Sequence, residues 1–232
     1  MKNTIKVLSI IVLVAVIGGS MIACNKSGVS GSSGGGGKTL NSAEELRVYL
    51  DKQPVNSPDK PIKVSMTIND PMLEKVVGVI KSAGKYVSLN ITGNALTKIP
   101  SEAFTNCETL VGIIIPNGVT GISWCAFESC HGLTGITIPD SVTEIGSGAF
   151  WYCTSLTSVT IPNSVTYIGE AAFDECTSLT SVTFQGTITS NNFGLKDWSA
   201  FEGDLREKYL AGGIGTYTTT APVNNNSIWT KQ

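Results

Sequence analysis

The chain has 232 residues and carries 16 lysine and arginine side chains against 18 aspartate and glutamate side chains, which gives a formal net charge of −2. Without residues 1–23, which include two lysines, 14 basic and 18 acidic side chains remain, a difference of −4. A nucleic-acid surface requires a basic stripe. The composition therefore predicts no nucleic-acid partner, and the small acidic excess favours no particular ligand.

The N-terminal segment has the pattern of an export signal. Two lysines precede an apolar run at residues 7–17, and small residues follow the run. The run is shorter than the roughly 20 residues that a membrane-spanning helix needs. A basic start, a short apolar run and a small-residue end are together typical of a signal peptide, which we place at residues 1–23.

The residues from Met21 to Cys24 resemble a bacterial lipoprotein signal, in which a cysteine that follows a small residue is acylated. Met21 stands where leucine is usual. The resemblance implies that Cys24 becomes a lipidated N-terminus, and each buried methylene of an acyl chain contributes about 0.8 kcal/mol to membrane binding. An ordinary cleaved signal and an uncleaved apolar anchor are the alternatives.

Residues 24–38 are rich in glycine and serine and have almost nothing to bury. They predict a flexible tether. The globular part is expected to begin near Thr39, with residues 39–85 forming a small α/β cap. Within this cap, Ser42 and Glu45 have the spacing of a capping box, in which each side chain satisfies the other residue's free backbone amide at a helix start.

The rest of the predicted cap contains a strand and a helix. Apolar and polar residues alternate from Val64 to Ile68, as in a half-buried strand. Asp70 and Pro71 are typical of a helix start, with Asp70 as the N-cap, and Gly84 is typical of the end of a helix that runs to Ala83. A second strand is expected at residues 86–91.

A repeat of 23 residues follows. Five kinds of position recur at this spacing: a phenylalanine, a cysteine, a leucine, a β-branched residue and an isoleucine before proline; the four copies of the first two are Phe104, Phe127, Phe150, Phe173 and Cys107, Cys130, Cys153, Cys176. A fixed period in the twenties with apolar residues at constant offsets indicates a solenoid, in which each coil buries its apolar face against the next. Residues 86–190 are therefore predicted to form the repeats, preceded by a degenerate first coil with one residue inserted.

Each coil is expected to contain one strand, which ends at the proline because proline has no amide to donate to a ladder. Leu156, Val159 and Ile161 are predicted to point inward. The outward strand positions form a neutral, hydroxyl-rich face with Gly112, Gly135 and Ile114, and we propose five of its residues as candidate binding positions: Thr137, Ser158, Thr160, Ser181 and Thr183.

The last segment, residues 191–232, is predicted to be an irregular C-terminal cap and tail. Ala200 and Phe201 are a displaced echo of the Ala-Phe step of the coils. Asp204 is expected to cap a short helix at residues 205–210, and the Thr/Asn-rich tail beyond Gly213 is expected to be extended.

The unit A-F-x-x-C-x-x-L-x-x-I-x-I-P resembles the BspA-like (treponemal-type) leucine-rich repeat proteins of bacterial surfaces, over about residues 87–190. Residues 205–210 and 228–232 also look like endings of spirochaete members. The resemblance implies an α/β solenoid, namely a short leucine-rich repeat array with 23-residue coils and a parallel β-sheet between the two caps. It also implies export, and adhesion to host matrix proteins or coaggregation as the function.

The recurring polar positions admit several interpretations. The cysteine column is interpreted as a buried packing ladder, with a disulfide or a metal site as the alternatives; five cysteines remain after Cys24, and an odd number cannot all pair within one chain. The column of Thr120, Thr143 and Thr166 is interpreted as a hydrogen-bonded turn ladder, with a row of binding residues as the alternative. His131, the single histidine, is expected to be exposed and without a catalytic role.

Aromatic residues at positions that the repeat does not fix are further candidates for contact with a partner, with local packing as the alternative: Trp124, Trp151, Tyr152 and Tyr167. We predict no catalytic residue, no cofactor and no metal ligand. The sequence favours a membrane-anchored lipoprotein at the outer membrane or cell surface that binds a protein, with a host matrix or cell-surface protein as the partner that the resemblance implies. The alternative is a structural lipoprotein that organises the envelope without a host ligand.

Overall fold

The computed structural model describes residues 37–194 and 199–232. The predicted signal peptide, Cys24 and residues 25–36 of the predicted tether lie outside the described residues, and so does Trp198. The first strand begins at Lys38, so the predicted end of the tether at residue 38 is wrong by one residue.

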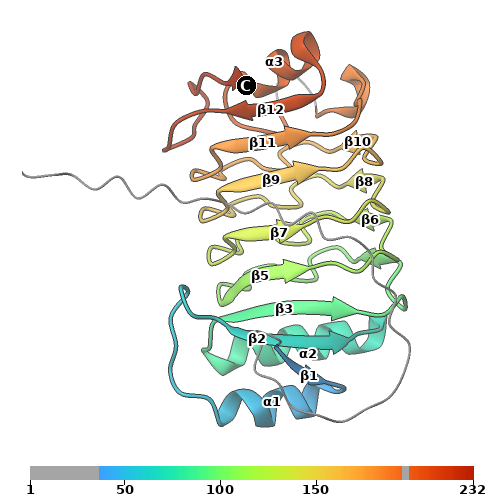
Figure 1. Cartoon of the computed structure of the whole chain (residues 1–232), viewed down its shortest axis with the longest axis vertical. Helices are drawn as coiled ribbons and strands as arrows, with labels where there is room; N and C mark the ends of the chain where they lie inside the picture. Colours follow the sequence, from blue (N-terminus) through green and yellow to red (C-terminus); the bar gives the residue numbers. More distant parts are fainter. Residues whose placement is uncertain (1–36, 195–198) are drawn as a thin grey trace, which may run out of the picture. The chain divides into compact units, whose positions relative to one another are not determined.

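The N-terminal cap is a parallel sheet covered by two helices. Its elements are β1 (Lys38–Leu40), α1 (Ala43–Asp51), β2 (Ile62–Thr67), α2 (Asp70–Ala83) and β3 (Val87–Thr92). β1 pairs with β2 and β2 with β3, all parallel, and α2 lies behind these strands in Figure 1. Because β3 pairs in turn with the first strand of the repeats, the cap continues the same sheet.

Two helix starts differ in detail from the sequence interpretation. At α1, Ser42 Oγ accepts from the Glu45 amide as predicted, but the Glu45 carboxylate accepts from Asn41 instead of returning to Ser42. At α2, the N-cap is Asn69, whose side chain accepts from the Met72 amide; Asp70 is already helical. Asparagine and aspartate are equally good caps, so the sequence alone does not separate neighbouring candidates. Gly84 ends α2 with a φ of 57°, as expected.

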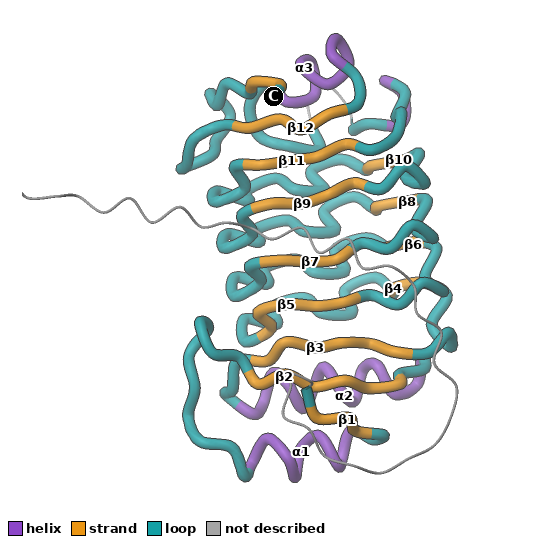
Figure 2. The backbone as a smooth tube through the Cα atoms, viewed as in Figure 1, coloured by secondary structure: helices purple, strands orange, loops and turns teal. Residues whose placement is uncertain are grey.

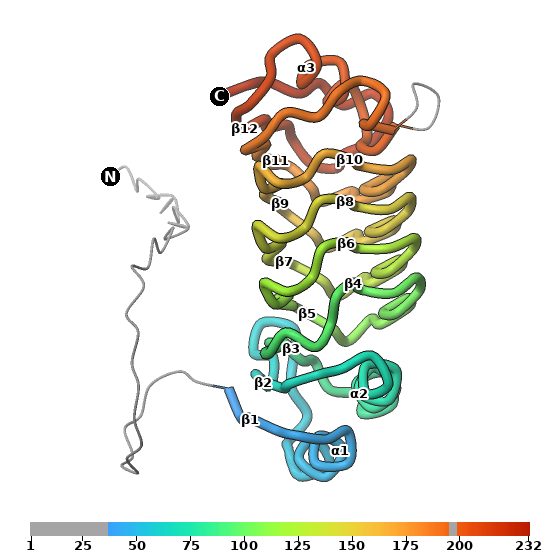
Figure 3. The backbone as a smooth tube through the Cα atoms, turned by 90° about the vertical axis from the view of Figure 1, so that its right-hand side faces the viewer, coloured from blue at the N-terminus to red at the C-terminus, as the bar shows by residue number. Residues whose placement is uncertain are grey.

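Each coil contains two short strands. The longer strand of each coil lies on one side of the stack, and we call these the long strands. They are the strands that the sequence predicts: β5 (Leu110–Ile114), β7 (Gly135–Thr137), β9 (Ser158–Ile161) and β11 (Ser181–Phe184). The structure adds a second parallel sheet in the order β10-β8-β6-β4 (Figures 2 and 3), built from Tyr167–Ile168, Glu144–Ile145, Gly121–Ile122 and Lys98–Ile99. Two-residue strands show no alternation of apolar and polar residues, so the sequence did not predict them.

The long strands stack in register along the repeats, with two irregularities. Between β3 and β5 the register shifts at Val87, so that Leu89 pairs with Ile113, 24 residues on, whereas Ile113 pairs with Ile136, 23 residues on. Strand pairing joins β1-β2-β3-β5-β7 in one sheet and β9-β11-β12-β13 in another, with no ladder between β7 and β9 among the described strands.

The phenylalanine column is the centre of the core, as predicted. The four rings are at most 1% exposed and stack at centroid distances of 4.9, 5.2 and 4.9 Å. Phe201 continues the column beyond the regular repeats, 4.6 Å from Phe173, which confirms the displaced Ala-Phe step. One continuous hydrophobic cluster therefore runs from the N-terminal cap to the C-terminal cap.

The C-terminal cap closes the last coil with antiparallel strands. After the short helix η1 (Ser190–Asn192) come α3 (Leu205–Gly212), β12 (Gly215–Thr218) and β13 (Thr230–Lys231). β12 runs antiparallel to β11, whereas the array itself is parallel (Figure 1). Asp204 occupies the predicted N-cap position of α3, but its carboxylate accepts from the Trp229 amide instead of capping the helix.

Candidate functional site

The coils present three lateral faces. We call the outward side of β5, β7, β9 and β11 the sheet face, and the outward side of β4, β6, β8 and β10 the second-sheet face. The turn face consists of the outward side chains of the turns at residues 101–108, 124–131, 147–154 and 170–177. Figure 3 shows the stack from the second sheet, with α2 at the base of the turn side.

The structure brings the five strand candidates together on the sheet face. Thr137, Ser158 and Thr160 are exposed, as the alternation predicts. Ser181 and Thr183 are half-buried because β12 lies beside them, and the Thr183 and Thr216 hydroxyls are 2.9 Å apart. Ile114, 48% exposed, interrupts the hydroxyls. The face is therefore small, neutral and partly covered at its C-terminal end.

The four aromatic candidates lie on the other two faces. Tyr167 belongs to β10 of the second sheet, so it lies in a strand, and it is 40% exposed. Trp124, Trp151 and Tyr152 lie on the turn face. Trp124 is 53% exposed and Tyr152 38%, whereas Trp151 is half-buried, with its ring centroid 5.1 Å from that of Tyr152. The strand candidates and the aromatic candidates therefore do not form one site.

The turns that carry this face are held by hydrogen bonds from each turn to the next. The Glu102 amide donates to the Trp124 carbonyl at 3.0 Å, and the Ser129 amide donates to the Trp151 carbonyl at 2.7 Å. Among the described residues, seven that are not glycine adopt the left-handed backbone region, all at two offsets of these turns: Glu102, Cys125, Ala171 and Asn106, Ser129, Tyr152, Glu175. Such residues cost about 1–3 kcal/mol each, so the stacking of the turns must offset a strained backbone.

The turn face is acidic. Residues 86–190 contain eight carboxylates and a single lysine or arginine, Lys98. Lys98 forms an ion pair with Glu144, which lies on the second-sheet face. Six of the eight carboxylates lie in the turns: Glu102, Glu108, Glu128, Glu170, Asp174 and Glu175. From the sequence, the acidic excess is too small to indicate a ligand, and Glu170, Asp174 and Glu175 are interpreted as single side chains on a solvated convex face. The clustering becomes visible only when the offsets of the six residues within the repeat are compared.

A seventh carboxylate, Glu202, lies at the C-terminal end of this face. It is 6% exposed, and one of its oxygens accepts from the Glu175 amide at 3.3 Å. The other oxygen is buried without a partner among the described residues. Burial, followed by the negative charge of Asp174, raises the pKa of Glu202 to about 7.

The cysteine column is a packing ladder, as predicted. In the part of the chain that the structure describes, five thiols are buried and free: Cys107, Cys125, Cys130, Cys153 and Cys176. The Cys153 thiol donates to the Phe127 carbonyl at 3.1 Å, and Cys130 and Cys176 make the same contact one coil away on either side. Burial raises the pKa of Cys107 to about 11 and that of Cys125 to about 12, so both thiols are protonated near neutral pH.

The threonine column and His131 also lie where the sequence places them. Thr120, Thr143 and Thr166 each donate to the carbonyl of the residue 23 positions earlier, which confirms the turn ladder. His131 is exposed, and its Nδ1 lies 3.4 Å from the Thr154 hydroxyl. Within residues 37–194 and 199–232, no group of three or more histidine, cysteine or acidic side chains is arranged to hold a metal ion.

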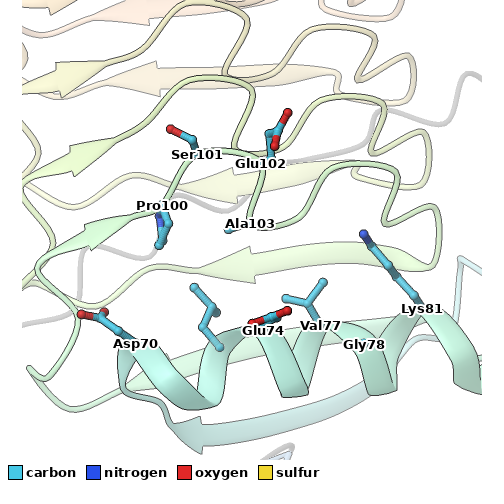
Figure 4. A pocket seen from close by; sticks show the side chains of 10 residues that line it. Asp70, Glu74, Val77, Gly78, Lys81, Pro100, Ser101, Glu102 and Ala103 are labelled. Atoms are coloured by element: carbon cyan, nitrogen blue, oxygen red, sulfur yellow. The ribbon is translucent and has the colours of Figure 1, made fainter.

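A cavity of about 550 Å³ lies between α2 and the turn of the first coil. Figure 4 shows Asp70, Glu74 and Lys81 on the helix, opposite residues 100–103 of the turn. Lys81 points toward the coil in this view, so a basic side chain stands at the N-terminal end of the acidic turn face. No sequence pattern predicts this cavity, because it depends on how α2 packs against the first coil.

A family model for the BspA type leucine-rich repeat region matches six copies across residues 81–195. The repeat array belongs to this family. The match confirms the resemblance stated from the repeat unit and extends it by a few residues at each end. None of the helices within the described residues has the length and apolar character of a membrane span.

Solved leucine-rich repeat structures resemble parts of the chain. A protein from Bacteroides ovatus is 36% identical over 41% of this chain and 25% of its own, with a TM-score of 0.38. The T. pallidum leucine-rich repeat protein is 26% identical over 55% and 54% of the two chains, with a TM-score of 0.41. A leucine-rich cell surface protein from Faecalibacterium prausnitzii is 23% identical over 83% and 48%, with a TM-score of 0.40. The chain thus spans between a quarter and about half of these proteins. No curated protein sequence matches it significantly.

Proposed function

We propose that this protein is a lipid-anchored bacterial leucine-rich repeat lipoprotein that binds a protein partner at the cell surface. One observation carries the proposal. The repeat fixes the inward positions of every coil, whereas the turn positions differ from coil to coil, as Trp124, Ser147 and Glu170 show at one offset. An invariant interior with a variable rigid exterior is the arrangement by which solenoids present extended binding surfaces.

The site favours binding over catalysis. The buried thiols are protonated near neutral pH, and the single histidine contacts a threonine hydroxyl at the surface. A nucleophile needs a base within hydrogen-bond reach and a third group to orient that base. The described contacts of His131 do not form such an arrangement, so we propose a non-enzymatic role.

The proposed anchor is Cys24, and its support is the sequence pattern of residues 1–24. A lipid on Cys24 followed by a Gly/Ser tether would hold the repeats near the membrane and leave them free to reorient. Adhesion to host matrix or neighbouring-cell proteins is the function that we infer for this arrangement.

Protease treatment of intact cells tests the proposal, with wild type compared with Cys24→Ser. We expect digestion of the wild-type repeats from outside, and release of the variant into the soluble fraction. Protection of the wild type until the outer membrane is opened would contradict surface display and favour an envelope-organising lipoprotein. Unchanged membrane association of Cys24→Ser would show that residues 7–17 are themselves the anchor.

A further inference from the structure

The outward side chains of the turn face combine two kinds of group that bind cations. Along one offset of the turns, backbone hydrogen bonds place Glu128, Trp151 and Asp174 in successive coils, because the Ser129 amide donates to Trp151 and the Tyr152 amide donates to Asp174. Along another offset, Trp124, Ser147 and Glu170 are linked in the same way through Cys125 and Gly148. Neighbouring residues of one column are therefore one coil apart, about 5 Å for strand-like stacking.

Two of the three aromatic rings of this surface, Trp124 and Tyr152, are exposed. Of the two tryptophans on the turn face, Trp124 is the more exposed. The Tyr152 ring packs beside the Trp151 ring. A cation over the face of a tryptophan or tyrosine is attracted by the ring quadrupole. Carboxylates occupy the turns of the coils before and after these rings, from Glu102 and Glu128 to Glu170, Asp174 and Glu175.

The electrostatic field of the turn face is not balanced from within. The coils contribute a single cationic side chain, Lys98, which is engaged by Glu144 on another face. Lys81 on α2 borders the surface at its N-terminal end, beside the first coil. At the C-terminal end, Glu202 lies next to Asp174 and Glu175, and it adds only part of a negative charge near neutral pH because burial raises its pKa to about 7. Within residues 37–194 and 199–232, none of the six turn carboxylates forms an ion pair, so the described part of the turn face carries an excess of negative charge.

We propose that the turn face at residues 124–131, 147–154 and 170–177 is the docking surface for a basic protein segment rich in arginine and lysine. Arginine fits both kinds of group, because its planar guanidinium pairs with carboxylates and stacks on aromatic rings. The rigid turns pre-organise these groups, which lowers the entropic cost of binding. The sheet face, which is neutral and built from small residues, offers no such attraction. The inference rests on the proposed protein-binding function and names its partner chemistry and its surface.

Calorimetric titration of the purified full-length chain in a nonionic detergent tests the inference. The probe is a short synthetic peptide of alternating arginine and serine, and a glutamate-serine peptide of the same length is the control. We expect the arginine peptide alone to bind, with an affinity that falls as salt rises. Glu128→Gln and Asp174→Asn should each weaken binding about three- to fivefold, and Trp124→Ala should weaken it by a similar factor.

A matched control separates this surface from general charge attraction. Asp140→Asn removes the same unit charge from an exposed residue in the turn after β7, away from the turn face, and should leave the affinity unchanged. Equal weakening by Asp140→Asn and Glu128→Gln would overturn the inference, and so would equal binding of the two peptides. Thermal melting of each variant confirms that it is folded. A cell-surface protein that adheres but does not bind the arginine peptide would overturn this inference and leave the proposed function standing.

Discussion

The sheet face and the turn face are built from the same 23-residue unit, yet they differ in charge, in backbone strain and in variability. On the sheet face, the strand ladder and the close spacing of coils favour small or β-branched residues, and the outward positions from Thr137 to Thr160 differ little. On the turn face, the buried phenylalanine and cysteine fix the backbone, and the outward offsets vary from Trp124 to Glu170. Where the interior alone holds the fold, the exterior is free to acquire specificity.

The largest expected effect concerns the column that supports the turn face. Phe150→Ala removes a fully buried ring stacked between Phe127 and Phe173, and it should lower the free energy of unfolding by about 3–5 kcal/mol. Thr160→Ala, on the sheet face, should change it by less than about 0.5 kcal/mol. Urea unfolding followed by circular dichroism measures both. A loss under about 1 kcal/mol for Phe150→Ala would contradict the stacked column.

The second effect concerns the acidic end of the turn face. The pKa of Glu202 is raised from 4.5 to about 7, so its neutral form is favoured in the folded state. The stabilisation is fully present below pH 4.5 and is lost as pH rises to about 7. This loss amounts to about 1–2 kcal/mol, after allowance for charge sharing with Asp174.

Glu202→Gln tests this assignment, because the amide keeps an oxygen for the Glu175 amide and cannot ionise. Melting temperatures across this pH range should fall in the wild type and stay flatter in the variant. Parallel profiles for the two proteins would show that Glu202 is not the group responsible.

The third effect uses the strained backbone of the turns. Ala171 and Gly148 occupy the same offset in neighbouring coils, with φ values of 50° and 62°. Ala171→Gly should stabilise the protein by about 1 kcal/mol, because glycine adopts this region without strain. Gly148→Ala should destabilise the protein by at least about 1 kcal/mol, because alanine is strained in this backbone region. The added Cβ would also lie 3.0 Å from the Cys125 sulfur. Changes of the same sign for the two variants, in chemical denaturation, would contradict the strain argument.

The smallest effect concerns the threonine ladder. Thr143 Oγ1 donates to the Thr120 carbonyl at 3.1 Å in an exposed turn. Thr143→Val keeps the shape and removes the donor, so the free energy of unfolding should fall by about 0.5–1 kcal/mol. Thr137→Val, exposed on the sheet face and without such a bond, is the control, and an equal change in both would show that the hydroxyl contributes nothing.

The sequence predicts the repeated interior of this molecule well because the interior obeys a strict period. The Phe column, the Cys ladder and the inward strand residues all follow from spacing, and Phe201 follows as an echo. Local hydrogen-bond partners do not follow, since Asn69, Asp70 and Asp204 are chemically similar caps whose roles depend on tertiary neighbours such as Trp229. The second sheet could not be predicted from the sequence, because its strands are two residues long and show no alternation of apolar and polar residues.

The candidate site was only half predictable for a related reason. The sequence identified Thr137 and Trp124 as outward residues, but it could not place them on different faces without the second sheet. The net charge of the whole chain also gives no sign of the acidic turns, because Lys81 and other basic residues of the N-terminal cap offset their negative charge in the sum. Counting charges by offset within the repeat shows the asymmetry directly.

The central claim is that this protein binds a partner through its turn face and not through its sheet face. Adhesion of intact cells to an immobilised arginine-serine peptide tests it most directly, with the chain displayed as wild type, as Trp124→Ala/Glu128→Gln/Asp174→Asn, or as Thr137→Ala/Ser158→Ala/Thr160→Ala. We predict that, when the variants are displayed in equal amounts on the cell surface, the turn-face variant loses adhesion and the sheet-face variant retains it. Loss of adhesion in the sheet-face variant alone would contradict the claim.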